Sequence, residues 1–179
     1  NALPFHTSAL SHAINKKKWR ERLRKVSRKG DFGAKQWADK ISRLLPQADR
    51  MLNRFEERLK RVVRREGPAF VFRSAHIGHC VNTKNGFRFL NWEQVSFGDP
   101  AYTLAVFLAS ISRRPDFEKI KGEMIRAYLR VKPISEFQEL VEQRLKEREI
   151  SDLIWTLWAH VERGDTRPVD KGTDLRERF

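Results

Sequence analysis

The segment from Phe87 to Ala105, FRFLNWEQVSFGDPAYTLA, constrains the fold of this chain more than any other stretch. Its first residues, Phe87 to Leu90, are apolar and aromatic around a single arginine, which predicts a short strand. Gly98-Asp99-Pro100 then predicts a helix start, because Asp caps a helix and Pro suits its first turn. The helix that follows, to about residue 111, is apolar almost all round and should be buried on most sides.

A tight turn precedes this strand. Asn85-Gly86 lies within the turn Thr83 to Gly86, and Asn-Gly pairs readily adopt the positive φ angles of hairpin turns. The apolar stretch Ala69 to Arg73 is then predicted as the partner strand. We therefore expect one short β-hairpin around Ala69 to Leu90.

Helices are predicted on both sides of this hairpin from apolar residues at helical spacing. They span about residues 11–28, 33–44, 47–65, 115–130 and 134–162. Pro46 should separate the second helix from the third, and a break is predicted near Ser151. The expected fold class is therefore mainly α, with residues 1–163 as one domain and the polar, charged residues 164–179 loosely ordered.

This order of elements resembles the larger, C-terminal lobe of the aminoglycoside phosphotransferase and choline kinase superfamily. The superfamily motif reads I-D-W-E and then G-D-P-x-x-D-L-A, and this chain has Leu90-Asn91-Trp92-Glu93 followed by Gly98 to Ala105. The resemblance implies a protein-kinase-like C-lobe, in which helices precede a hairpin that carries the catalytic loop, and further helices follow. It is close over residues 87–105 and coarse over most of the chain.

The residues that carry the family's chemistry are replaced in this sequence. The family's Asp before Trp holds magnesium on ATP, but here it is Asn91, which lacks the negative charge that a hard cation favours. Residues 50–98 contain no Asp, so no alignment supplies the catalytic-loop Asp that receives the substrate's proton. Ungapped counting places Arg73 at that position and a shorter hairpin places His76 there, and the sequence leaves both open. Glu93 is the carboxylate nearest to the metal position.

The resemblance therefore implies a degenerate kinase-fold protein, a pseudokinase, that acts by binding and holds no cofactor as this chain. Mg-ATP is implied only if the family activity is retained. The family's N-terminal lobe has no counterpart, because no strand-rich stretch precedes residue 69. An alternative is a small-molecule phosphotransferase whose N-lobe is missing from this chain, with His76 as its degenerate catalytic residue and Asn91 and Glu93 as its degenerate cofactor-binding residues.

A second point of resemblance lies in the last predicted helix. The stretch Ser151 to Ala159, SDLIWTLWA, is similar to a Trp-rich helix of choline kinases, whose aromatic side chains help to form a cage for a quaternary ammonium group. This likeness implies Trp155 and Trp158 as substrate-binding residues. Tryptophans three residues apart on an amphipathic helix also suit a hydrophobic core, and both interpretations stay open.

The loop between the predicted strands contains two histidines and a cysteine. Residues 76–79 spell His-Ile-Gly-His, a signature of class I aminoacyl-tRNA synthetases, but no alternating strand–helix pattern surrounds it. His76, His79 and Cys80 are adjacent candidates for metal ligands without a distant second pair. Because structural zinc sites usually need two separated pairs, we predict no metal site.

Positive charge is the other distinctive property of the chain. Its 37 Lys and Arg exceed 23 Asp and Glu, giving a formal net charge of +14. Such a field favours anionic partners and disfavours polycationic ligands such as aminoglycosides. In residues 16–29, nine Lys and Arg accompany one acid, Glu21. This run is either a contact for an anionic partner or a solvated face, and a basic nucleic-acid-binding helical module is a further alternative function.

The location of the chain is predicted from its cysteine content and its hydropathy. Cys80 is the only cysteine, which excludes an internal disulfide and favours a reducing compartment. No apolar run reaches the roughly 20 residues of a membrane span. We therefore expect a cytoplasmic protein with no membrane span.

Overall fold

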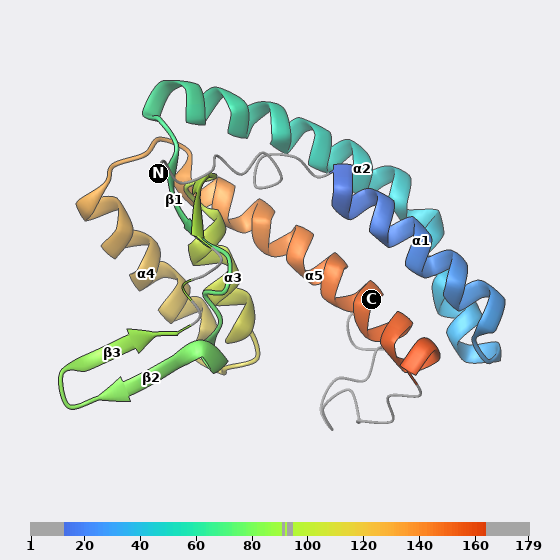
Figure 1. Ribbon diagram of the computed structural model, residues 1–179. Coiled ribbons are helices and arrows are strands. Elements are labelled where there is room, and N and C mark those ends of the chain that lie inside the picture. Colours follow the sequence, from blue (N-terminus) through green and yellow to red (C-terminus); the bar gives the residue numbers. More distant parts are fainter. Residues whose placement is uncertain (1–12, 91, 93–94, 164–179) are drawn as a thin grey trace. The chain divides into compact units, whose positions relative to one another are not determined.

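The computed structural model describes residues 13–90, 92 and 95–163 (Figure 1). This part of the chain is mainly helical, with five α-helices and two short two-stranded antiparallel sheets. The elements are α1 (Ala13–Lys29), α2 (Phe32–Glu66), β1 (Ala69–Phe72), β2 (Cys80–Thr83), β3 (Gly86–Phe89), β4 (Val95–Gly98), α3 (Tyr102–Ser110), α4 (Phe117–Val131) and α5 (Phe137–Arg163). The prediction of a mainly helical chain with a short hairpin is confirmed.

The chain divides into two compact units. The described part of unit 1 is residues 50–90, 92 and 95–149, and that of unit 2 is residues 13–49 and 150–163. Helices α2 and α5 each contribute residues to both units. Sequence patterns alone predicted one domain over residues 1–163, and the predicted loose tail, residues 164–179, lies outside the described residues.

Helix α2 continues through Pro46, so the predicted break there is wrong. Apolar residues spaced alternately three and four apart stay in phase across the proline, which keeps one face of the helix apolar throughout. These residues are Ala38, Ile41, Leu45, Ala48, Leu52, Phe55, Leu59 and Val62. Pro46 is exposed, so the loss of one backbone hydrogen bond falls on the solvent side of the helix.

Unit 1 contains four strands rather than the predicted two. β2 pairs with β3 in a hairpin closed by Thr83 and Gly86, and β1 pairs with β4. The turn was therefore predicted correctly, but the partner of β3 was not, because Ala69–Phe72 pairs with Val95–Gly98 instead. Gly86 has a φ of 94°, which a side chain would strain.

The core of unit 1 is formed by four helices. It is made of apolar side chains from α2, α3, α4 and α5, among them Phe55, Leu108, Ile125 and Phe137. Every residue of α3 is buried or half-buried, as its all-round apolar sequence predicted. Buried Phe137 also stacks on Tyr128 with 4.2 Å between ring centroids.

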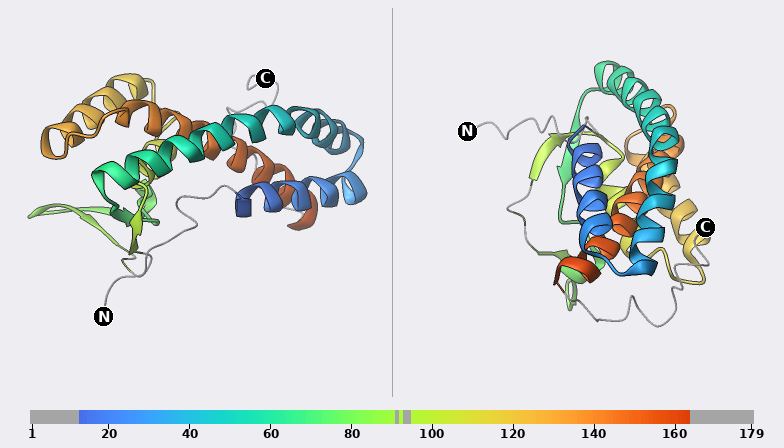
Figure 2. Two further views of the ribbon diagram at one scale, coloured as in Figure 1. Left: turned by 90° about the horizontal axis from the view of Figure 1, so that it is seen from above. Right: turned by 90° about the vertical axis from the view of Figure 1, so that its right-hand side faces the viewer.

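Unit 2 consists of α1, the first half of α2 and the end of α5. Figure 1 and Figure 2 show α1 alongside the first half of α2, and Arg20 pairs with Asp49 between them. The turn joining them needs Gly30, because a Cβ there would lie 2.7 Å from the Val26 carbonyl oxygen. Asp31 then caps α2, its Oδ1 accepting a hydrogen bond from the Ala34 backbone N–H at 2.7 Å.

Helix α5 passes Ser151 without the predicted break. Ser151 Oγ accepts a hydrogen bond from Trp19 Nε1 at 3.0 Å, so this polar residue serves the packing of α5 against α1. Trp19 is only 1% exposed, and its indole N–H needs such a partner.

Across the described residues, every helix is too short or too polar to qualify as a membrane span.

Candidate functional site

The loop after β1 holds His76, the residue placed by sequence at the degenerate catalytic-loop position. Its Nδ1 accepts a hydrogen bond from the Gly78 backbone N–H at 3.0 Å and so caps the short 3-10 helix Ile77–His79. His79 Nδ1 donates to the Ser74 carbonyl oxygen at 2.9 Å. Ile77 N donates to Ser110 Oγ at 2.9 Å, which ties the loop to α3. These contacts shape the loop, and none of them supplies a carboxylate.

The part of the chain that the structure describes is poorly suited to binding a metal ion. There, no group of three or more His, Cys, Asp and Glu side chains is placed to hold an ion. Burial raises the pKa of the Cys80 thiol, which disfavours the thiolate that a metal would need. The two predicted cofactor-binding residues, Asn91 and Glu93, lie outside the described residues.

The Trp of the motif, Trp92, belongs to an aromatic cluster beside β1. Its ring stacks on Phe72 with 4.7 Å between centroids, and its Nε1 donates to the Phe89 carbonyl oxygen at 2.7 Å. Phe70 lies 6.4 Å from Trp92 and 6.2 Å from Phe97, its cross-strand partner. Trp92, Phe70 and Phe97 are nevertheless 52%, 45% and 37% exposed. Three rings in one cluster are thus available to a partner.

Asp99 is structural, as its place before Pro100 suggested, although α3 begins later than predicted, at Tyr102 with Ala101 as its N-cap residue. It is fully buried, and its Oδ1 accepts a hydrogen bond from the Ala101 backbone N–H at 2.8 Å. Its Oδ2 forms an ion pair with Arg144, which also forms one with Glu147. Arg144 and Glu147 are each only 4% exposed. Burial raises the pKa of Asp99, and the positive charge of Arg144 opposes that rise. No sequence pattern indicated this network, because Asp99 and Arg144 are 45 residues apart.

The two predicted substrate-binding tryptophans lie in unit 2, and both contact the chain's own cations. The Arg163 guanidinium lies 5.8 Å from the Trp155 ring centroid and 5.2 Å from that of Trp158. Arg22 and Lys25 lie 5.2 and 6.0 Å from the Trp158 centroid. Trp158 is half-buried and Trp155 is 39% exposed, so the core interpretation fails for Trp155. Each of the two rings therefore already has at least one cationic side chain of the same chain over it.

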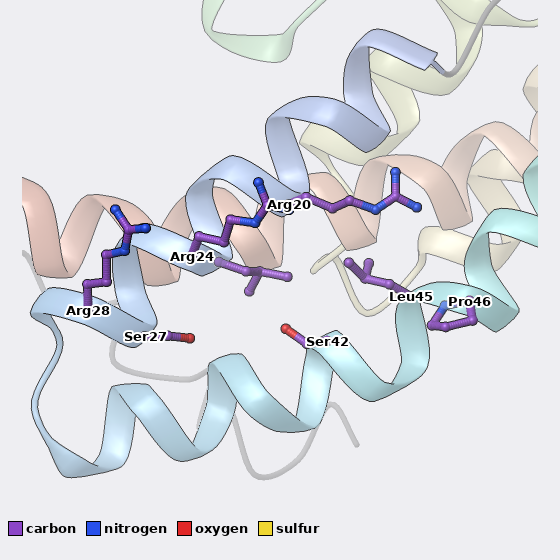
Figure 3. A pocket seen from close by; sticks show the side chains of 8 residues that line it. Arg20, Arg24, Ser27, Arg28, Ser42, Leu45 and Pro46 are labelled. Atoms are coloured by element: carbon purple, nitrogen blue, oxygen red, sulfur yellow. The ribbon is translucent and has the colours of Figure 1, made fainter.

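A pocket of about 410 Å³ lies between α1 and the first half of α2, all within unit 2. Three arginines, two serines and three apolar residues line it: Arg20, Leu23, Arg24, Ser27, Arg28, Ser42, Leu45 and Pro46. Figure 3 shows the three guanidinium groups in a row along α1, with Ser27 and Ser42 on facing sides of the gap. The sequence identified the basic run but not its neighbours on α2.

No protein-family model, curated protein or solved structure matches the chain. The candidate function therefore depends on the residues and contacts described above.

Proposed function

We propose that this chain is a degenerate, protein-kinase-like C-lobe of the aminoglycoside phosphotransferase and choline kinase type, and that it acts by binding rather than by phosphoryl transfer. The observation that carries the proposal is the chemistry of the loop after β1. His76, at the candidate catalytic-loop position, caps a backbone turn. Residues 50–98 contain no Asp that could take the catalytic role.

The order of elements in unit 1 supports the kinase-like part of the proposal. The loop lies between β1 and β2, the β2–β3 hairpin leads to the Asn-Trp-Glu motif, and β4 leads to Gly98-Asp99-Pro100 and α3. This order is the one that the resemblance implies, with helices on both sides. The alternative of an active phosphotransferase would require Glu93 to replace two missing carboxylates.

The exposed aromatic cluster supports the binding part of the proposal. Phe70 and Phe97 are cross-strand partners on the β1–β4 sheet, and Trp92 adds a third exposed ring in contact with Phe70. Clustered exposed aromatic rings mark interaction surfaces more often than isolated ones do. A partner chain, including a separate N-lobe, is the proposed occupant.

Calorimetry with millimolar Mg-ATP tests the proposed loss of catalysis. We expect no saturable, magnesium-dependent heat from the folded chain, because the carboxylates that hold magnesium and accept the substrate's proton are absent. The matched variants are Glu93→Ala and Glu66→Ala, which each remove one carboxylate. A saturable, magnesium-dependent signal that Glu93→Ala abolishes and Glu66→Ala preserves would refute the proposal and identify Glu93 as a substitute ligand.

A further inference from the structure

The basic run of α1 has no role in the proposed function, and its position in unit 2 suggests one. We propose that the pocket between α1 and α2 is a binding site for the phosphate groups of a nucleic-acid backbone. This second activity goes beyond the proposed kinase-like function, and it concerns residues in the other compact unit.

The first argument is the spacing of the three arginines that line the pocket. Arg20, Arg24 and Arg28 are four residues apart, so successive side chains stand about 6 Å apart along the helix axis. Figure 3 shows them in one row. A row of cations at this axial repeat matches a ligand with regularly repeated phosphates, such as a nucleic-acid strand.

The second argument is the charge that remains uncompensated. Asp49 pairs with Arg20 across the gap, but no carboxylate among the described residues forms an ion pair with Arg24 or Arg28. Both side chains are exposed, so an incoming phosphate can reach them. Guanidinium groups bind phosphate through paired N–H donors, and Ser27 and Ser42 add hydroxyl donors at the pocket wall.

The third argument favours nucleic acid over a membrane surface. A helix that binds at a lipid interface inserts an apolar face among the acyl chains. The apolar residues of α1 with described side chains, Trp19, Leu23 and Val26, are all at most 2% exposed and hence unavailable for insertion. Among its described side chains, α1 therefore offers a partner charge and no exposed apolar residue, which suits a phosphate backbone.

Binding of a short fluorescein-labelled DNA duplex to the full chain, measured by anisotropy across a salt series, tests this proposal. The double variant R24Q/R28Q removes two charges from the pocket, and the matched control R61Q/R64Q removes two from exposed positions on α2 in unit 1. A plot of the logarithm of the association constant against the logarithm of the salt concentration has a negative slope. We expect R24Q/R28Q to make this slope shallower by about 1.8, since each phosphate contact contributes about 0.9. The same relation gives a roughly 10- to 100-fold loss of affinity near 0.1 M salt. The control should change both values far less.

A second pair of variants leaves the arginines intact. Ser42→Glu places a carboxylate in the pocket, and Gln36→Glu adds the same charge at another exposed position of α2. Only Ser42→Glu should weaken duplex binding severalfold. Equal effects within each matched pair would mean that net charge alone governs binding and would overturn the proposal.

Two competing ligands complete the test. Inorganic phosphate at constant ionic strength should not displace the duplex at low millimolar concentration, because a single phosphate replaces only one contact. Displacement there would overturn the proposal in favour of a free-phosphate site. Saturable binding to vesicles of phosphatidylserine, without binding to the duplex, would overturn it in favour of a lipid surface. Neither result affects the Mg-ATP test of unit 1.

Discussion

Replacing Arg144 by Met should destabilise unit 1 more than any surface substitution. Arg144 lies between two buried carboxylates, those of Asp99 and Glu147, and all three residues are at most 4% exposed. Its guanidinium also lies 5.1 Å from the Phe55 ring centroid and 5.7 Å from that of Tyr102. Methionine keeps the apolar stem and the helix propensity of the position, so the variant isolates the loss of charge.

The size of the effect follows from the burial of the carboxylates. Removing one partner of a buried ion pair typically costs about 3–5 kcal/mol, because the remaining charge stays desolvated and unpaired. For a chain of this length each kcal/mol lowers the melting temperature by about 2–4 °C, so we expect a fall of about 6–20 °C. The triple variant D99N/R144M/E147Q should recover most of the loss. It leaves no buried charge, and the amide oxygen that it introduces at position 99 can still accept the hydrogen bond from the Ala101 N–H.

The loss of stability in Arg144→Met should also depend on pH, and it should grow as the pH rises. Burial already raises the pKa of Asp99 above its usual value, and Arg144 opposes that rise. Without Arg144 the folded-state pKa rises further above the unfolded one. A raised carboxyl pKa lowers the unfolding free energy as pH increases from the unfolded value towards the folded one. The difference between wild type and Arg144→Met should therefore be smallest near pH 4 and grow towards neutrality.

Urea denaturation followed by circular dichroism, repeated between pH 4 and 7, measures both effects. Lys146→Met, an exposed neighbour on the same helix, is the matched control and should stay within about 0.5 kcal/mol of wild type. A loss below about 1 kcal/mol for Arg144→Met, or one that shrinks as pH rises, would show that Asp99 and Glu147 do not depend on this charge.

Three further local features can be tested by substitution and thermal or urea denaturation. Pro46→Ala should stabilise the chain by up to about 3 kcal/mol, because it restores a helical hydrogen bond in α2, and no gain would contradict a continuous helix. Gly86→Ala should cost about 1–2 kcal/mol at its positive φ. Gly33→Ala on α2 should not destabilise, because its Cβ would meet only Asp31 Oδ1, at an ordinary contact distance of 3.6 Å. Ser151→Ala should cost about 1–3 kcal/mol by leaving the Trp19 N–H unpaired, and Ser151→Thr should retain stability; equal effects would argue against the hydrogen bond.

The error at Pro46 shows which local signal dominates in a long helix. Proline predicted a break, but the buried positions on either side of it, Leu45 and Leu52, keep the same helical phase. The cost of one missing hydrogen bond at an exposed position is smaller than the benefit of burying an apolar face along the whole helix. Periodicity was thus the better guide, and it was present in the sequence.

The error in the strand pairing has a different cause. The turn at Thr83 to Gly86 is local chemistry and was predictable, whereas the β1–β4 pair joins segments more than twenty residues apart. β2, Cys80–Thr83, is short and partly polar because most of it is exposed, so it lacked the apolar signature of a strand. A two-stranded ribbon with little buried surface has only weak periodicity of apolar residues in its sequence. The more apolar stretch Ala69–Phe72 was therefore predicted as the partner of β3 instead of β2.

The charged sites were hard to predict as well, because a sequence gives the number of charges without showing which of them are compensated by neighbours. Arg144 is neutralised by carboxylates in a buried network, and Arg24 is exposed with no ion pair among the described residues, although both are arginines on helices. Within the basic run, three cations pair with acids and two lie over the Trp158 ring: Lys17, Arg20 and Lys29, then Arg22 and Lys25. The two cations over the ring keep their charge, so only pairing with acids lowers the net charge that a partner meets from the nine cations of the run. Two of them, Arg24 and Arg28, lie one helical turn apart at the same pocket, and this position makes a specific contact a sharper hypothesis than a diffuse basic surface.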